Sequence, residues 1–227
     1  MNMEKRQNST KRVAMIAMFC ALTYASMFVV KIPVQFLDLD IKDSLTVLCG
    51  LLFGPVSAAI ISIVVPLLQF ITISSTGWYG LIMNVLSSFF FSVVASVIYK
   101  YRKNFYDAIL ALVCGALSMT AVMMIANLFI TPFYMTQVMN IPMSTADVAE
   151  MIPALLLPFN LTKGILNAAI VLLFYKPISN AMKKTGIIKQ DMSVSKNTIF
   201  STKNIVVSAI AVLIIALSFA IIYFVLK

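Results

Sequence analysis

The segment PALLLPFNLTKGILN, from Pro153 to Asn167, carries three polar side chains at a spacing that could bind a small molecule. It lies in an apolar run, 151–175, that is long enough to cross a bilayer, since a membrane helix needs about 20 apolar residues. Asn160, Lys163 and Asn167 are spaced i, i+3 and i+7, which places them on one helical face. A lysine in the middle of such a helix costs roughly 2.5–3.5 kcal/mol on insertion scales. We therefore expect this face to line a pocket for a small molecule.

Two further asparagines, Asn84 and Asn127, lie in other apolar runs and could complete the pocket. An amide offers both a donor and an acceptor, so a few amides and one ammonium suit a planar heterocycle with carbonyls and ring N–H groups. The alternative is that the asparagines bond to one another across helices, which is common in membrane bundles. Lys163 has no acidic partner in any apolar run, which favours a ligand or backbone carbonyls as its partner.

The composition is that of an all-α, polytopic membrane protein. Of the 227 residues, 61% are hydrophobic and 11% are charged, and the mean hydropathy is +1.00. The net charge of +9 does not indicate nucleic-acid binding, because the basic residues gather at the ends of apolar runs, as in cytoplasmic loops. This bias predicts a cytoplasmic N-terminus and an external location for the acidic segments, which hold Asp38, Asp40, Asp43, Asp147 and Glu150.

The apolar runs predict three parts: a six-helix membrane domain at 1–184, a polar cytoplasmic linker at 185–204, and a seventh transmembrane helix at 205–227. Within the domain, Asp43 or Ser44 is expected to cap the second helix. Pro66 should kink the third helix, and Pro132 should end the fifth. The stretch 136–150 is expected to be a polar loop. The six helices are expected at 13–30, 44–53, 56–73, 79–99, 105–134 and 151–175.

Two other patterns suggest binding surfaces. Ala17, Ala21 and Ala25 repeat every fourth residue, which lets a second helix approach closely; the partner could be another protein or a helix of this chain. The 31–42 loop contains VQFLDLD, in which apolar and polar side chains alternate. This pattern predicts a short extended segment over the membrane face. It could cover the pocket, with Leu37, Asp38, Leu39 and Asp40 against a ligand, or it could be an ordinary connector.

No enzyme motif is found. The chain has no histidine, no CxxC among its three cysteines, no GxxxxGK[ST] phosphate loop, and no HExxH or GxSxG. We expect no catalytic residue, no metal ligand, no cofactor and no ATPase activity of its own.

With these residues in view, the chain resembles the riboflavin-type substrate-binding (S) component of an energy-coupling factor (ECF) vitamin transporter. The resemblance covers roughly 12–184, and LPFNLTKGI at 157–165 is its most specific part. LDLDIKDSL at 37–45, LLFGP at 51–55 and the AxxxA of Ala17 and Ala21 also carry it. Where riboflavin-type members tend to have Lys-Asn in helix three, this chain has Val65-Pro66.

The resemblance implies a six-helix bundle in a bacterial cell membrane that takes riboflavin, or a related flavin, from outside as the transported ligand. It implies a complex with a transmembrane coupling subunit, which would contact the AxxxA, and with two cytoplasmic ATPases. Asn127, Asn160 and Lys163 would hold the flavin, and Trp78, Tyr134 or Phe159 would flank it. The alternatives are an S component for another vitamin, for FMN or FAD, or for a pyrimidine, a membrane enzyme, or a helper subunit that binds no ligand.

Overall fold

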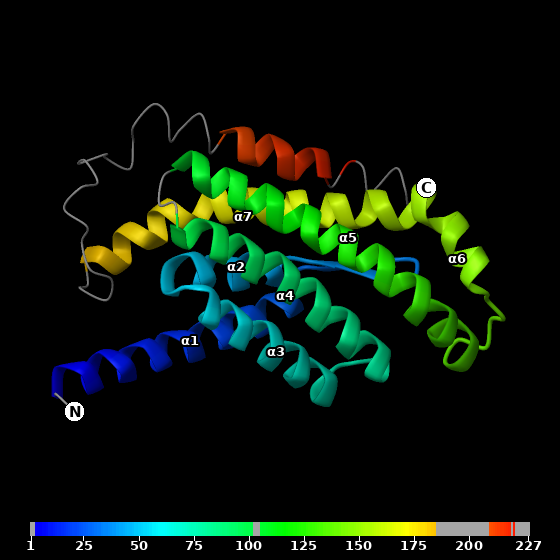
Figure 1. Cartoon of the computed structure of the whole chain (residues 1–227), viewed down its shortest axis with the longest axis horizontal. Coiled ribbons are helices and arrows are strands. Elements are labelled where there is room, and N and C mark those ends of the chain that lie inside the picture. The colour runs from blue at the N-terminus through cyan, green and yellow to red at the C-terminus, as the bar shows by residue number, and fades with distance from the viewer. Residues whose placement is uncertain (1–2, 102–104, 185–208, 219, 221–227) are drawn as a thin grey trace.

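The structure is a computed structural model, and it describes residues 3–101, 105–184, 209–218 and 220. The described chain is a bundle of long helices with one short hairpin (Figure 1). The helices are α1 (Met3–Val29), α2 (Lys42–Phe53), α3 (Pro55–Thr72), α4 (Gly77–Tyr101), α5 (Phe105–Gln137), α6 (Thr145–Met151) and α7 (Leu157–Lys184). A π-helical turn, η1 (Ile152–Leu156), leads into α7, and β1 (Lys31–Val34) pairs antiparallel with β2 (Leu37–Asp40).

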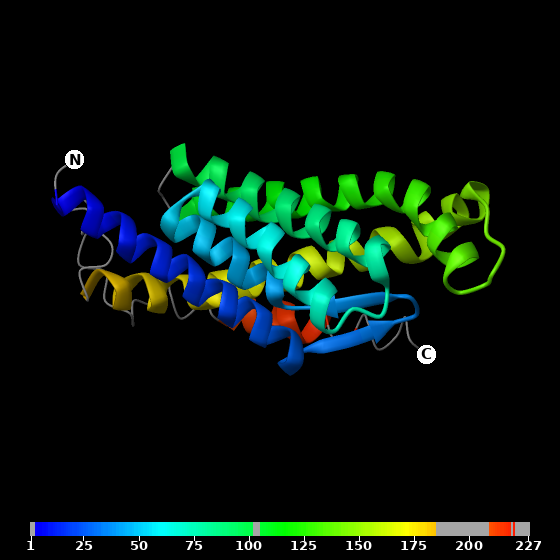
Figure 2. The ribbon, with the colours of Figure 1, turned by 90° about the horizontal axis from the view of Figure 1, so that it is seen from below.

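Helix α2 is the centre of the bundle. It packs against α1, α3, α4 and α7, and most of its residues are buried (Figure 2). With 12 residues it is about 18 Å long, too short to cross the roughly 30 Å of hydrocarbon. Five longer helical segments are long and apolar enough to span a membrane: 10–29, 55–72, 77–101, 106–137 and 145–184. The protein is therefore a multi-pass membrane protein in which the short helix α2 is enclosed by longer ones.

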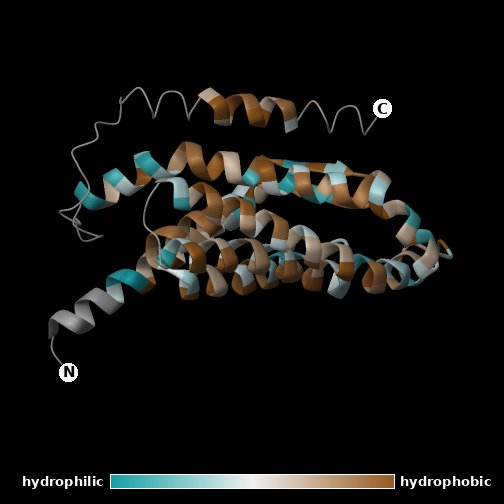
Figure 3. Ribbon diagram, turned by 45° about the horizontal axis from the view of Figure 1, so that its top comes forward, coloured by the Kyte–Doolittle hydropathy of each residue, from teal (hydrophilic) through white to brown (hydrophobic). Residues whose placement is uncertain are grey.

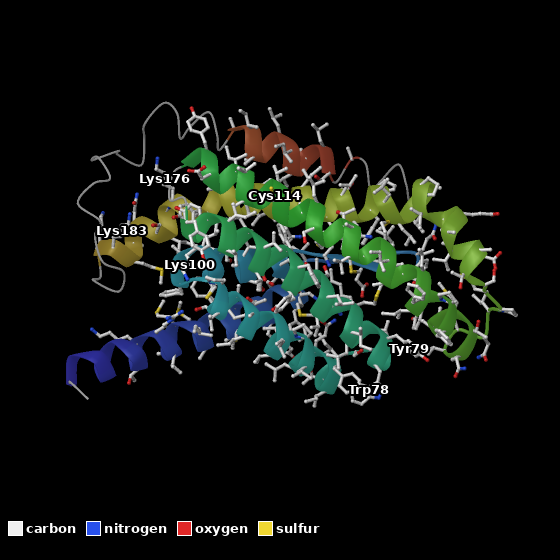
Figure 4. All side chains as sticks on the ribbon, in the orientation of Figure 1. Trp78, Tyr79, Lys100, Cys114, Lys176 and Lys183 are labelled. Atoms are coloured by element: carbon white, nitrogen blue, oxygen red, sulfur yellow. The ribbon has the colours of Figure 1, made fainter. Side chains whose placement is uncertain are left out.

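The two ends of the bundle differ in their side chains. Lys100, Lys176 and Lys183 lie at one end, and Trp78 and Tyr79 lie at the other (Figure 4). Apolar residues cover the length of the helices between the ends (Figure 3). Many large apolar side chains face outward, including Ile71, Phe129 and Phe133, as expected of a surface that contacts lipid.

Small residues let α4 pack closely against both α2 and α5. Ser88 and Ser96 are buried on the side of α4 that faces α2, where Ser88 donates to Asp43 and Ser96 lies against Gly50. Toward α4, Gly115 of α5 leaves no room for a side chain, since a Cβ there would lie 2.7 Å from the carbonyl oxygen of Phe91. Such small residues are typical of helix contacts in membranes.

Gly115→Ala is therefore expected to destabilise the bundle by about 1–3 kcal/mol, because the new methyl group meets backbone rather than a movable side chain. Thermal unfolding in detergent measures this effect. Ser118→Ala, a change on the same helix that adds no atom, serves as the control. Equal unfolding temperatures for the two variants would contradict the close approach of α4 and α5.

Several helix ends differ from the sequence-based expectations. Helix α1 begins at Met3, within the basic segment, rather than at 13. The prediction that Pro132 ends the fifth helix is wrong, because α5 continues to Gln137. The expected loop at 136–150 contains α6, which begins with a reciprocal capping pair of Ser144 and Asp147. Neither Asp43 nor Ser44 caps α2, whose N-cap is Ile41.

The C-terminal part is described only in part. Residues 209–218 form a short apolar helix, and the prediction of a seventh transmembrane helix at 205–227 stays a prediction. The predicted linker at 185–204 and the remainder of that helix, except for residue 220, lie outside the described residues.

Candidate functional site

A cavity of about 710 Å3, including its open mouth, lies between the tip of the hairpin and the inner faces of α4, α5 and α7. The residues that line it are Phe36, Leu37, Asp38, Thr76, Tyr79, Gly80, Met83, Asn84, Ser87, Met123, Asn127, Ile130, Thr131, Tyr134, Phe159, Asn160 and Lys163. The predicted site residues Asn84, Asn127, Asn160, Lys163, Leu37 and Asp38 are thus brought together from four different elements.

Four buried charges lie at one wall of the cavity. The Nζ atom of Lys163 lies 3.2 Å from Oδ2 of Asp40 and 3.6 Å from Oδ2 of Asp43. The Nζ atom of Lys42 lies 3.5 Å from Oδ2 of Asp40. Two cations and two anions balance one another, so the group, which we call the charge cluster, is neutral. Of its four members, only Lys163 lines the cavity.

The charge cluster is held by hydrogen bonds to two helices, α3 and α4. Lys42 donates to Oδ1 of Asn84 on α4, at 2.6 Å, and to Oε1 of Gln69 on α3, at 3.2 Å. Asp43 accepts from the hydroxyls of Ser87 and Ser88 on α4. Lys42 and Asp43 therefore each have an ionic partner inside the cluster and hydrogen-bond partners outside it, as burial of a charge requires.

Asp40 connects the hairpin to this cluster. Burial alone would raise the pKa of Asp40, but the charges of Lys163 and Lys42 and their hydrogen bonds hold that pKa below its ordinary value. Asp40 is therefore ionised at neutral pH. One of its oxygens, Oδ1, is buried and has no hydrogen-bond partner among the described residues.

Asn167 joins α7 to the segment between the hairpin and α2. Its Nδ2 donates to the carbonyl oxygen of Asp40 at 3.0 Å, and its Oδ1 accepts from the backbone N–H of Ser44 at 2.8 Å. The side chain is fully buried and does not line the cavity. The bond to Ser44 satisfies one of the free N–H groups at the start of α2, which is the role we had expected of a side-chain cap. Asn167 is thus a structural residue beside the site.

The hydrogen bonds of two asparagines show which end of each amide is left for a ligand. The Nδ2 of Asn160 donates to the carbonyl oxygen of Leu156, so the Oδ1 acceptor is left over. The Oδ1 of Asn84 accepts from Lys42, so the Nδ2 donor is left over. Neither remaining atom has a partner among the described residues. Asn160 therefore offers the cavity an acceptor, and Asn84 offers it a donor.

Asn127 has less to offer a ligand. Its Nδ2 donates to the carbonyl oxygen of Met123, and its Oδ1 accepts from the hydroxyl of Thr131, both within α5. The residue lines the cavity, and it retains one N–H and one oxygen lone pair that could bond to a ligand.

Aromatic rings form much of the remaining wall. The rings of Tyr79 on α4 and Tyr134 on α5 have centroids 5.9 Å apart, and Phe159 and Phe36 also line the cavity. Trp78, predicted as a possible stacking residue, does not line it. Its side chain is exposed and packs against Phe70, with 4.4 Å between the ring centroids.

Two sequence-based expectations require correction. The partner of Lys163 is a pair of carboxylates, Asp40 and Asp43, rather than a ligand or backbone carbonyls alone. Both carboxylates are buried. Leu39 and Asp40 do not line the cavity, because they lie further from the hairpin turn than Leu37 and Asp38, which do line it. Sequence reasoning missed Lys42 as well, although it stands between the two aspartates.

The alanines of α1 lie on its outer surface. Ala17, Ala21 and Ala25 are all exposed, so the described helices of this chain do not cover them. Internal packing does not explain their spacing. Among the described residues, no group of three histidine, cysteine, aspartate or glutamate side chains could hold a metal ion.

Comparison with known proteins agrees with this architecture. Residues 11–175 match the family model of the ECF transporter, substrate-specific component. The riboflavin transporter RibU of Staphylococcus aureus (strain TCH60) is 28% identical over 191 residues, which cover 81% of this chain and all of that protein. A solved structure described as the S component of a bacterial ECF transporter superimposes with a TM-score of 0.64 at 29% identity, covering 77% of this chain and 99% of that one. The chain belongs to the family of substrate-specific components of ECF transporters.

Proposed function

We propose that this protein captures riboflavin, or a closely related flavin, in the cavity beside Lys163. The match to the Staphylococcus aureus riboflavin transporter supports the ligand, and the polar groups of the cavity support it independently. The flavin would be the transported ligand and not a cofactor, and the protein would bind it without chemical change.

The observation that carries the proposal is the set of hydrogen-bonding groups left free in the cavity. The polar edge of a flavin has two carbonyl acceptors on either side of one ring N–H donor. Asn160 offers an acceptor for the N–H, and Asn84 and Lys163 offer donors for carbonyls or ring nitrogens. One acceptor and two donors complement one donor and two acceptors.

The charge and the walls of the cavity support the same ligand. The charge cluster is neutral, so an uncharged ring gains a hydrogen bond from Lys163 without having to neutralise it. Tyr79, Tyr134, Phe36 and Phe159 provide flat apolar surface for a planar ring system.

The complex and its orientation follow as further parts of the proposal. A transmembrane coupling subunit would bind the exposed face of Ala17, Ala21 and Ala25, and two cytoplasmic ATPases would drive uptake. The end with Lys100, Lys176 and Lys183 would face the cytoplasm of a bacterial cell, together with the N-terminus, and the cavity mouth would face outward (Figure 4).

A titration of riboflavin into the purified protein tests the proposal. Binding should quench the flavin fluorescence and saturate at one flavin per chain, because the ring would lie against tyrosine side chains. A thermal-shift panel of other vitamins, FMN and FAD should show the largest stabilisation with riboflavin or another flavin. Stabilisation by a vitamin without a flavin ring, and none by flavins, would reject the ligand while leaving the cavity intact.

Asn84→Asp tests the donor assigned to Asn84. The aspartate keeps an oxygen for Lys42 and keeps the shape, but it removes the N–H that faces the cavity. We expect riboflavin affinity to fall by roughly tenfold or more, equivalent to about 1.4 kcal/mol. The unfolding temperature should also fall, because the added carboxylate gives the charge cluster a net negative charge. Asn180→Asp on α7, whose side chain does not line the cavity, is the matched control. Unchanged affinity in Asn84→Asp would remove Asn84 from the binding set.

A further inference from the structure

The helix at 209–218 lies outside the part of the chain that matches the family model, which ends at 175. It runs alongside the bundle next to α7 and the hairpin (Figure 1, Figure 2). One of its faces is covered by protein. Ala211 and Ser218, seven residues apart, are 1% and 3% exposed, whereas Leu213 and Leu217 are more than half exposed. The small residues on the covered face permit close approach of the helix to the bundle.

The covered face contacts the seam between the hairpin and α7. Ile215, half-buried between Ala211 and Ser218, packs against an apolar cluster that contains residues of both elements. The buried members of this cluster, which we call the seam cluster, are Val34 and Leu39 of the hairpin, Leu155 of η1, and Phe159 and Leu166 of α7. Through Ile215, the 209–218 helix thus packs on a cluster to which both the hairpin and α7 contribute.

The seam cluster also forms the back of the cavity wall. Phe159 belongs to the cluster and lines the cavity, and Phe36 and Leu37 at the hairpin tip pack on the cluster and line the cavity. A two-stranded hairpin is marginally stable alone, so its position depends on what packs against it. The hairpin end at Asp40 is fixed by Lys163 and Asn167, whereas the tip has apolar contacts to hold it.

From these contacts we infer that the 209–218 helix braces the hairpin against α7 and thereby slows the release of the bound ligand. The hairpin tip must move for a ligand to leave past Phe36 and Leu37, and this movement disturbs the seam cluster. A helix that packs on the cluster from outside makes the movement costlier. The part of the inference that concerns ligand release rests on the proposed function.

Two pairs of full-length variants test the inference. Ile215→Ala removes the contact with the seam cluster, and Leu213→Ala makes a comparable truncation on the exposed face. Ala211→Leu adds bulk to the covered face and should displace the helix, and Ala216→Leu adds the same bulk on the exposed face. All four residues stay apolar, so membrane insertion of the helix is preserved.

The first readout is hydrogen exchange of the hairpin amides, 31–40, in detergent micelles without any ligand. Exchange should be faster in Ile215→Ala and Ala211→Leu than in their controls, because local opening of the hairpin becomes easier. Equal exchange in all four variants would overturn the brace, and this result does not depend on what the cavity binds.

The second readout is the dissociation rate of riboflavin, followed by the recovery of its fluorescence. We expect roughly a fivefold faster release in Ile215→Ala and Ala211→Leu, and wild-type rates in Leu213→Ala and Ala216→Leu. Faster hairpin exchange with unchanged release would overturn the effect on the ligand. If wild-type protein binds no flavin, the proposed function fails, and hydrogen exchange still decides whether the helix braces the hairpin.

Discussion

Lys163→Met is expected to lower riboflavin affinity by roughly a hundredfold, because the variant loses a charged hydrogen bond to the ligand. The same change should destabilise the fold by about 3–5 kcal/mol, since Asp40 and Asp43 then share a buried site with one cation, Lys42. Flavin titration measures the first effect, and thermal unfolding in detergent measures the second.

The double variant Lys163→Met/Asp43→Asn separates the two effects. It removes one cation and one anion, so the remaining pair, Lys42 and Asp40, is balanced at 3.5 Å. An asparagine at 43 can still accept from Ser87 and Ser88. We expect the unfolding temperature to recover much of the loss, while the affinity stays low. Recovery of affinity together with stability would show that Lys163 serves the charge cluster and not the ligand.

Asn167→Leu is expected to cause the largest loss of stability among changes that do not touch the cavity, about 3 kcal/mol. Leucine leaves the carbonyl oxygen of Asp40 buried without this donor, which costs about 1–3 kcal/mol. The N–H of Ser44 also loses its 2.8 Å bond to Asn167 and keeps the 3.2 Å bond to the carbonyl oxygen of Ile41. Because these bonds fix the end of the hairpin, riboflavin affinity should fall as well. Thermal unfolding and flavin titration of one sample give both values.

Asn180→Leu is the matched control for this change. It makes the same substitution on the same helix, at a half-buried position whose side chain makes no hydrogen bond with the described residues. We expect it to leave both values near those of the wild type. An Asn167→Leu variant as stable as Asn180→Leu would contradict the link between α7 and the start of α2.

Most membrane helices could be predicted from the sequence, because an apolar run of the right length has one stable arrangement in a bilayer. Gly54-Pro55 marked the break between α2 and α3 correctly, since the helix ends at a left-handed glycine and restarts at proline. Pro132, in contrast, led to a wrong prediction of where the fifth helix ends. Inside a membrane, a proline is tolerated within a helix where neighbouring groups satisfy the freed carbonyls, so α5 continues past it.

The candidate site could be predicted in part. The i, i+3 spacing of Asn160 and Lys163 identified the lining face of α7 correctly. The same spacing predicted that Asn167 also lines the pocket, but its side chain bonds to Asp40 and Ser44 behind the cavity wall. Helical spacing gives the face of a residue, but it does not give the depth at which another element covers that face.

The acidic partners of Lys163 could not be predicted by a search of the apolar runs. Asp40 ends a strand and Asp43 lies in the first turn of α2, and the fold carries both into the interior. The sequence does hold a signal, since LDLDIKD places a lysine between aspartates directly before an apolar helix. The cost of burying these charges is offset only because the four charges lie together in the fold. The sequence does not show that Lys163 lies beside the other three, so their burial was not predicted.

The most direct test of the central claim is an experimental structure of the wild-type protein prepared with riboflavin. We predict density for the flavin ring in the cavity, with its polar edge within hydrogen-bond distance of Asn84, Asn160 and Lys163, and with the ion pairs of Lys163 to Asp40 and Asp43 still present. An empty cavity at saturating riboflavin, or a flavin bound elsewhere on the bundle, would contradict the account.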